Sequence, residues 1–188
     1  MRILDLVERQ EKFELIFINP TSERFRQCFS KLETLTAIEY VMMFPDRIKI
    51  TPVEMDWNGA TEYQFERMKR SRNPEYESRS SEFHVRFDKY VNGMSNPVRL
   101  SYQSGFDQLV GHGNSSDRLV FLGGFNTEFE ILLSVQKLFL AGQLPVVISD
   151  LCSSPSERAH FSSLESISRF AEIIDTRDLQ KSETFGRQ

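Results

Sequence analysis

The sequence predicts an α/β fold, a three-layer sandwich in which a parallel sheet of about five or six strands is flanked by helices. Two runs, residues 13–18 and 118–124, are almost wholly apolar, which is typical of parallel strands covered on both faces. Strand-like runs also alternate with segments of helical periodicity along the chain. We expect 118–124 to be a central strand with 13–18 beside it, and residues 1–188 to form a single domain.

The first half of the chain supplies a strand, a helix and a second strand. The run 13–18 ends at Asn19-Pro20, which is a turn signal. The next segment predicts an amphipathic helix, because apolar side chains recur at helical spacing: Phe25, Cys28, Phe29, Leu32 and Leu35. Residues 38–44 are apolar enough for a second buried strand that stops at Pro45. Residues 46–96 are dense in charge and indicate no regular element.

The second half repeats the alternation more clearly. Apolar runs predict strands, and the segments between them predict helices near 104–110, over 127–142 and after Ser154. Gly142 is a typical helix stop. In the last helix, Ser154 can cap, Pro155 fits the first position and Glu157 completes a capping box. The expected strands are 97–102, 118–124, 144–149 and 171–175.

Composition and charge exclude several classes of function. The net charge of −4 gives no electrostatic case for binding nucleic acid or an anionic membrane. No apolar run approaches the roughly 18 residues of a membrane span, and the N-terminus lacks the apolar core of a secretory signal. Cys28 and Cys152 do not suggest a disulfide framework. We therefore expect a cytoplasmic location.

Residues 118–179 resemble the isochorismatase-like cysteine hydrolases, a family that includes nicotinamidases and N-carbamoyl amidohydrolases. The family pattern is a strand, G-V-x-T-x-x-C-V, a helix ending in glycine, a strand ending in D-A, a serine-rich turn and a helix bearing histidine. Here "LVFLGGFNTEFEI" and "LPVVISDLCSSPSERAHFSSL" match it, including Asp150 and His160. Upstream, "LIFINPT" and "RLSYQSGF" match the family's first strand and its lysine segment more weakly.

The resemblance implies three catalytic positions, and this chain changes each of them. The family's aspartate falls on Asn19, its nucleophilic cysteine on Glu130, and its lysine on Leu100 or, one residue away, on Arg99. An amide cannot serve as the carboxylate base, and leucine carries no charge. The resemblance therefore favours a non-catalytic protein that binds a small molecule or assembles as a homo-oligomer. The alternative is a hydrolase of an amide, carbamoyl or isochorismate-like compound that uses altered residues.

The turn before Glu130 is the ligand pocket that the resemblance implies, formed by Phe125, Asn126 and Thr127. In the resembled enzymes the peptide bond corresponding to Phe125–Asn126 is cis, and it aims the amides of residues 126 and 130 at a substrate oxyanion. Thr127-Glu128-Phe129-Glu130 also fits a capping box, in which the Glu130 carboxylate would bond to the amide of Thr127. Glu130 is thus either a helix cap, which we favour, or a replacement catalyst.

The remaining chemical residues indicate no second site. His84, His112 and His160 lack the spacing of a metal site, and a histidine such as His160 is most often a buried residue with a polar partner. Cys152 has the character of a small core residue. The basic segment 68–72 is surrounded by acids, which favours a solvated loop or an interface contact. The loop "GHGN" lacks the spacing of a phosphate-binding loop, so we expect no cofactor.

Overall fold

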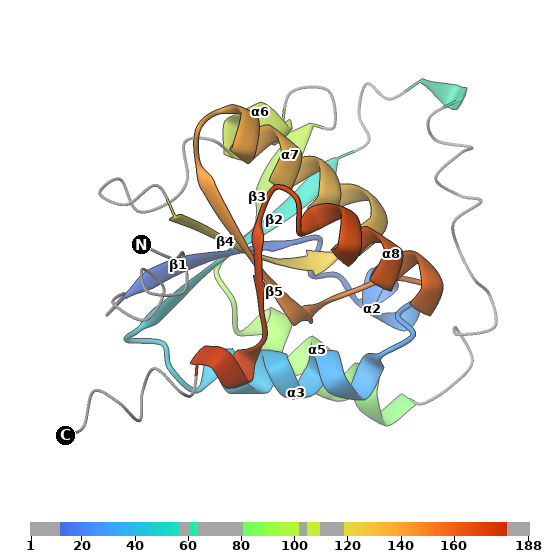
Figure 1. Cartoon of the computed structure of the whole chain (residues 1–188). Coiled ribbons are helices and arrows are strands. Elements are labelled where there is room, and N and C mark those ends of the chain that lie inside the picture. Colours follow the sequence, from blue (N-terminus) through green and yellow to red (C-terminus); the bar gives the residue numbers. More distant parts are fainter. Residues whose placement is uncertain (1–11, 57–60, 64–80, 102–104, 110–118, 180–188) are drawn as a thin grey trace.

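A computed structural model shows a six-stranded, wholly parallel sheet with the strand order β3-β2-β1-β4-β5-β6 (Figure 1). It describes residues 12–56, 61–63, 81–101, 105–109 and 119–179. The predicted fold class is confirmed. The strands are β1 (Phe13–Ile18), β2 (Ile48–Asp56), β3 (Val98–Ser101), β4 (Leu119–Phe125), β5 (Leu144–Ser153) and β6 (Glu172–Ile174).

The two most apolar runs form the middle of the sheet. β1 and β4 pair in parallel, with Leu15 opposite Phe121, and all seven residues of β4 are buried. Their side chains alternate between the two faces, as the pleat of a strand requires. Leu15 and Phe121 enter one core cluster and Ile16 enters the other. The expectation of two adjacent strands buried on both sides is correct.

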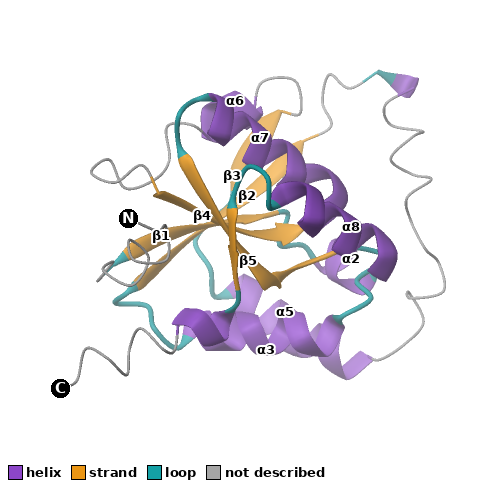
Figure 2. Cartoon of the chain, viewed as in Figure 1, coloured by secondary structure: helices purple, strands orange, loops and turns teal. Residues whose placement is uncertain are grey.

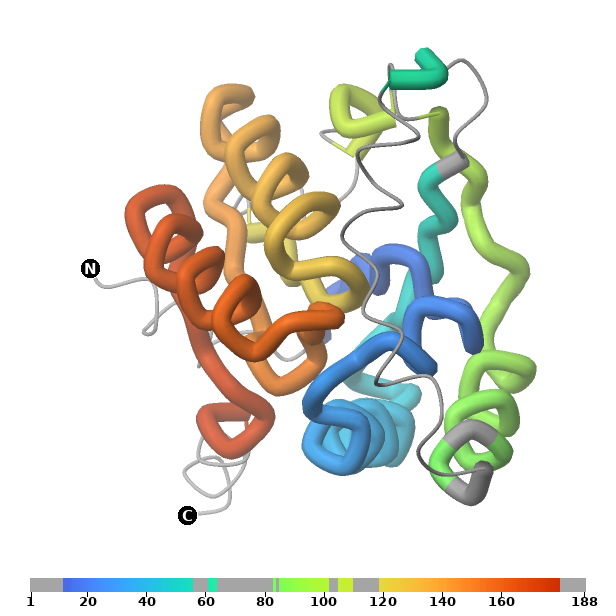
Figure 3. Tube along the Cα trace, turned by 90° about the vertical axis from the view of Figure 1, so that its right-hand side faces the viewer, coloured from blue at the N-terminus to red at the C-terminus, as the bar shows by residue number. Residues whose placement is uncertain are grey.

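Helices cover both faces of the sheet (Figures 2 and 3). Phe25, Leu35 and Phe87 join the core on one face, and Leu109, Val135 and Ile167 join it on the other. The first layer holds α2 (Ser22–Arg26), α3 (Lys31–Met42) and α5 (Ser81–Asn92). The second holds α6 (Gly105–Gln108), α7 (Leu132–Leu140) and α8 (Glu157–Ile167), and the π-helical turn η3 (Thr127–Ile131) leads directly into α7.

The predicted strand at 38–44 is wrong, because those residues continue helix α3. Leu35, Ile38 and Val41 recur at helical spacing and are buried, while Glu39 and Tyr40 between them are only partly buried. A short apolar run does not distinguish a strand from a buried helical face. The second strand is instead β2, inside the segment that indicated no regular element.

The start of the last helix is also two residues later than predicted. Ser156, and not Ser154, is the N-cap of α8, and its hydroxyl accepts a hydrogen bond from the amide of Ala159 at 3.3 Å. Ser154 is buried and its hydroxyl donates to the carboxylate of Glu128. In the part of the chain that the structure describes, no helix is long and apolar enough to cross a membrane.

Candidate functional site

The candidate site lies where the order of the sheet reverses direction. From β1 the chain moves outward to β2 and β3, whereas from β4 it moves to β5 and β6 on the other side. Ligands of open parallel sheets bind at such a switch point, outside the carboxyl ends of the strands. Asn19 follows the end of β1, and η3 follows the end of β4. The fold thus brings together Asn19 and Glu130, which are 111 positions apart in the sequence.

Glu130 is the centre of this site and is fully buried. Its Oε1 accepts a hydrogen bond from the Asn19 side-chain amide at 3.1 Å and another from the Arg24 guanidinium at 3.1 Å. Its Oε2 accepts from the backbone amide of Asn126 at 2.8 Å. A buried carboxylate is tolerated where an opposite charge and hydrogen-bond donors replace its water. Here Arg24 supplies the charge, and the amides of Asn19 and Asn126 supply further hydrogen bonds.

Asn19 is held rigidly from both ends of its side chain. Its Oδ1 accepts from the amide of Met55 at 2.7 Å, on β2, while its Nδ2 donates to Glu130. Its backbone is left-handed, with φ of 50°, a conformation that asparagine adopts more readily than most residues. An amide suits this position beside a carboxylate, because an aspartate there would place two negative charges in contact.

The turn between β4 and η3 has the geometry that the resemblance implies. The Phe125–Asn126 peptide bond is cis, as predicted. Gly124 has a φ of 125°, and a Cβ at this position would lie 2.0 Å from the carbonyl oxygen of Ile18. Only glycine fits so close to the neighbouring strand.

The predicted capping box is shifted by one residue. The N-cap of η3 is Asn126, and the Glu130 carboxylate bonds to the amide of Asn126 instead of that of Thr127. The Thr127 hydroxyl is paired with Nδ1 of His160 at 2.9 Å. Burial lowers the pKa of His160 to about 4, so the imidazole is neutral near pH 7. His160 is therefore a buried histidine with a polar partner, as the sequence suggested.

Of the three predicted pocket residues, Asn126 and Thr127 lie at the site, and all three are closed to solvent. The ring of Phe125 is in the core, with the rings of Phe17, Phe25 and Phe87 around it. Asn126 is 1% exposed, and its Oδ1 is a buried acceptor without a hydrogen-bond partner among the residues that the structure describes.

The position of the family's lysine, on Leu100 or Arg99, brings no charge into the site. Leu100 is buried in the apolar cluster that also holds Met55 and Phe106. The side chain of Arg99 points the other way, because neighbours along a strand alternate, and it is 76% exposed beside Glu54 at 3.5 Å. The structure therefore brings Asn19 and Glu130 together but leaves Arg99 outside.

Two further residues of the site have no counterpart in the sequence interpretation. Arg24 comes from α2, and Glu128, which receives the Ser154 hydroxyl, comes from the turn of η3. Burial raises the pKa of Glu128, although the bond from Ser154 and the charge of Arg24 oppose this. Arg24 lies only six positions after the end of the buried strand β1, and that closeness is the one signal in the sequence that could have marked it.

Neither cysteine offers a nucleophile. Both are buried, and burial raises the pKa of Cys28 to about 12 and that of Cys152 further still. A thiol must ionise to attack a carbonyl, so these two are inert near neutral pH. Among the residues that the structure describes, no group of three His, Cys, Asp or Glu side chains is placed to hold a metal ion.

Solved structures share this fold over most of the chain. An isochorismatase-like hydrolase from Alkaliphilus metalliredigens is similar with a TM-score of 0.61 and 10% identity, over 91% of this chain and 98% of its own. The fold is that of the isochorismatase-like hydrolases. A pyrazinamidase/nicotinamidase from Streptococcus mutans is similar with a TM-score of 0.53 and 15% identity, over 86% of this chain and 99% of its own.

A third similar structure is the YcaC gene product of Escherichia coli, described as an octameric hydrolase of unknown specificity. Its TM-score is 0.54 and its identity 8%, over 90% of this chain and 77% of its own. No protein-family model matches the sequence, and no curated protein matches it either. At such identities the similarity establishes the fold but not the activity, which has to be argued from the residues of the site.

Those residues form a buried hydrogen-bond network around Glu130. In the resembled enzymes the amide that follows the cis bond faces a substrate oxyanion. Here that amide, on Asn126, already donates to the chain's own Glu130 carboxylate. The backbone donor that could stabilise a developing negative charge is thus already engaged by a side chain of the same chain.

Proposed function

We propose that this protein is a non-catalytic member of the isochorismatase-like hydrolase fold, which acts by binding a ligand or by assembling with other copies of itself. The observation that carries the proposal is the buried Glu130 carboxylate, whose two oxygens accept from Asn19, Arg24 and Asn126. Because both oxygens of this buried carboxylate are engaged by donors of the same chain, the group is poorly placed to attack a substrate or to take up a proton from one.

The three donors to Glu130 described above, on Asn19, Arg24 and Asn126, do not replace the family's proton-transfer group. The Asn19 amide is neutral, and both of its ends are engaged, by Met55 and by Glu130. The imidazole of His160 is bonded to the Thr127 hydroxyl. Leu100 fills the lysine position with an apolar side chain. These substitutions together support loss of the hydrolytic reaction.

One observation supports ligand binding, and two support assembly. The unpartnered Oδ1 of Asn126 could accept a hydrogen bond from a small ligand that reaches the turn. Assembly is supported by the similar octameric hydrolase and by large apolar side chains on the surface. The most exposed of these on α7 and α8 are Leu140 (80%) and Phe161 (57%).

The test is an ammonia-release assay with primary amides and carbamoyl compounds, nicotinamide among them. The wild-type protein is expected to give the same background rate as Glu130→Ala. The matched control is Glu165→Ala, which removes an exposed carboxylate from α8. Turnover that survives in the control and is lost in a folded Glu130→Ala or Asn19→Ala protein would establish the alternative, a hydrolase with altered residues. Light scattering measures assembly separately, with a species larger than the 21.9 kDa chain expected.

A further inference from the structure

Helix α8 has one face in the core and the opposite face at the surface of the molecule (Figures 1 and 3). Its buried positions recur at helical spacing, on His160, Ser163 and Ile167. A second stripe at the same spacing is exposed, and we call it the α8 stripe. It consists of Arg158, Phe161, Ser162 and Glu165.

A large aromatic ring stands at the centre of the α8 stripe. Phe161 is 57% exposed. The centroid of its ring lies 5.1 Å from that of His160 and 6.2 Å from that of Phe29. These contacts support the exposed ring from its own chain, which lowers the conformational entropy lost when a partner covers it. Aromatic side chains placed in this way are enriched at the centre of protein–protein interfaces.

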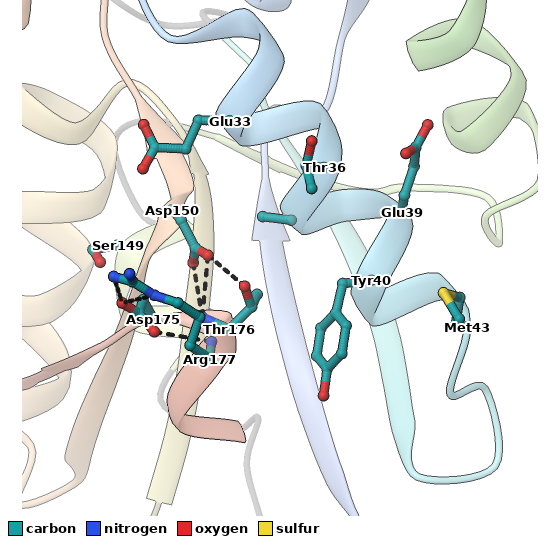
Figure 4. Close-up of a pocket in the computed structure, with 11 residues that line it drawn as sticks. Glu33, Thr36, Glu39, Tyr40, Met43, Ser149, Asp150, Asp175, Thr176 and Arg177 are labelled. Atoms are coloured by element: carbon teal, nitrogen blue, oxygen red, sulfur yellow. Dashed lines mark hydrogen bonds and ion pairs between the residues drawn. The ribbon is translucent and has the colours of Figure 1, made fainter. Parts of the chain in front are cut away.

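The two charges of the α8 stripe have no partner within the described part of the chain. Elsewhere on the surface, exposed charges pair with one another. Figure 4 shows one such pair beside the hollow between α3 and β5, where Arg177 donates to Asp175 at 2.9 Å. By contrast, the side chains of Arg158 and Glu165 form no hydrogen bond or ion pair with any residue that the structure describes.

The spacing of these charges makes the α8 stripe complementary to itself. Arg158 and Glu165 are seven positions apart. In an α-helix this is about 10.5 Å and nearly two full turns, so both side chains lie on the same side. Two α8 helices can pack antiparallel about a two-fold axis that passes between residues 161 and 162. Arg158 of each copy then lies opposite Glu165 of the other, and Phe161 lies opposite the small side chain of Ser162.

We propose that two copies of this chain associate by packing α8 against α8 in antiparallel orientation through the α8 stripe. Charge complementarity selects a second copy as the occupant, because the two-fold axis forms two Arg158–Glu165 pairs at once. A parallel arrangement would instead oppose like charges. Ser162 and Ser166 are small and exposed, so the two helix axes can approach closely. This inference rests on the assembly role proposed above and names the surface that carries it.

The test is analytical ultracentrifugation of the full chain over a series of concentrations. The wild-type protein is expected to form a reversible dimer of twice the 21.9 kDa chain. Arg158→Glu and Glu165→Arg each replace both attractive pairs with repulsive ones, so each should weaken the dimer by about tenfold or more. The double variant that combines them restores opposite charges in exchanged positions. Its dimer affinity should return to within about threefold of the wild type.

Matched controls make the same charge changes on the other face of the sheet. Lys89→Glu on α5 and Glu33→Arg on α3 alter exposed side chains, and they should leave the dimer affinity unchanged. Phe161→Ala should weaken the dimer by about tenfold, because it removes the central ring. Glu165→Gln removes the pairs without adding repulsion. It should cost only about threefold in dimer affinity, and it leaves Glu130 and its donors unchanged.

Each contrary result has a distinct meaning once circular dichroism has established that the variants are folded. A dimer of unchanged affinity in Phe161→Ala and in both single charge variants would overturn the α8 interface while leaving assembly in place. Weakened single variants without recovery in the double variant would overturn the antiparallel pairing. A wild-type protein that stays monomeric would overturn this inference together with the assembly role. Turnover in the ammonia-release assay would overturn the non-catalytic role and leave the α8 interface standing.

Discussion

Replacing Glu130 should cost more stability than any exposed substitution, because three donors would lose a charged acceptor. In Glu130→Gln the shape is kept, but one of the carboxylate oxygens becomes an NH₂ group that faces a donor. Arg24 is also left without its partner, although its side chain is 17% exposed and water compensates part of that loss. Breaking a buried ion pair costs about 3–5 kcal/mol, and because Arg24 is partly exposed we expect a loss at the lower end, about 3 kcal/mol.

That loss can be measured by urea unfolding and by thermal melting. For a domain of this size, about 3 kcal/mol corresponds to a fall in melting temperature of about 6–12 °C. Glu165→Gln is the control, since it makes the same chemical change on the exposed face of α8. A Glu130→Gln protein as stable as this control would refute the network as described.

Glu130→Ala tests the same hydrogen-bond network in a second way. It empties the space in front of Asn19, Arg24 and the amide of Asn126 while leaving these donors in place. Acetate can then occupy the carboxylate position, and a ligand that binds only the folded state stabilises it by mass action. Acetate should therefore raise the melting temperature of Glu130→Ala more than that of wild type or of Glu165→Ala at equal ionic strength. Equal shifts in all three proteins would contradict the reasoning.

Three further predictions concern the surroundings of Glu130. Asn19→Asp should destabilise the fold by about 2 kcal/mol at pH 7, because it turns a donor into a second carboxylate, and the loss should shrink on acidification as the pair takes up a proton. Because the folded pKa of His160 is lowered from 6.5 to about 4, its contribution is full above pH 6.5 and is lost as pH falls toward 4. His160→Gln should remove that component, about 3 kcal/mol at most, from the pH dependence of urea unfolding; identical pH profiles would count against it. Gly124→Ala should cost about 3 kcal/mol or more, against a small effect of Gly93→Ala, whose Cβ would meet nothing closer than 3.4 Å; similar losses in the two proteins would show that the turn tolerates a side chain.

The fold could be predicted because its strongest signals are local. The apolar runs of β1 and β4 identify buried parallel strands without knowledge of the partner strands. The error at 38–44 has the opposite cause, since only the packing of Ile38 and Val41 against the sheet distinguishes the helix from a strand. β2 escaped notice because Lys49, Glu54 and Asp56 interrupt its apolar residues.

The site could be predicted only in part, for a similar reason. Its two central residues, Asn19 and Glu130, follow from strand ends and from the resemblance. Their partners depend on side-chain geometry. Arg24 reaches Glu130 from another helix, and the Glu130 carboxylate accepts from the backbone amide of Asn126 and not from that of Thr127. Arg99 and Leu100 were alternatives in the sequence, and only the direction of each side chain on β3 separates them.

A crystal structure of the wild-type protein grown in acetate would show whether Glu130 or an external anion occupies the three donors. We expect the Glu130 carboxylate to lie within hydrogen-bond distance of the Asn126 amide, the Asn19 amide and the Arg24 guanidinium. An acetate ion bound to the Asn126 amide, with the Glu130 side chain turned away, would contradict it and would show an anion site open to a substrate.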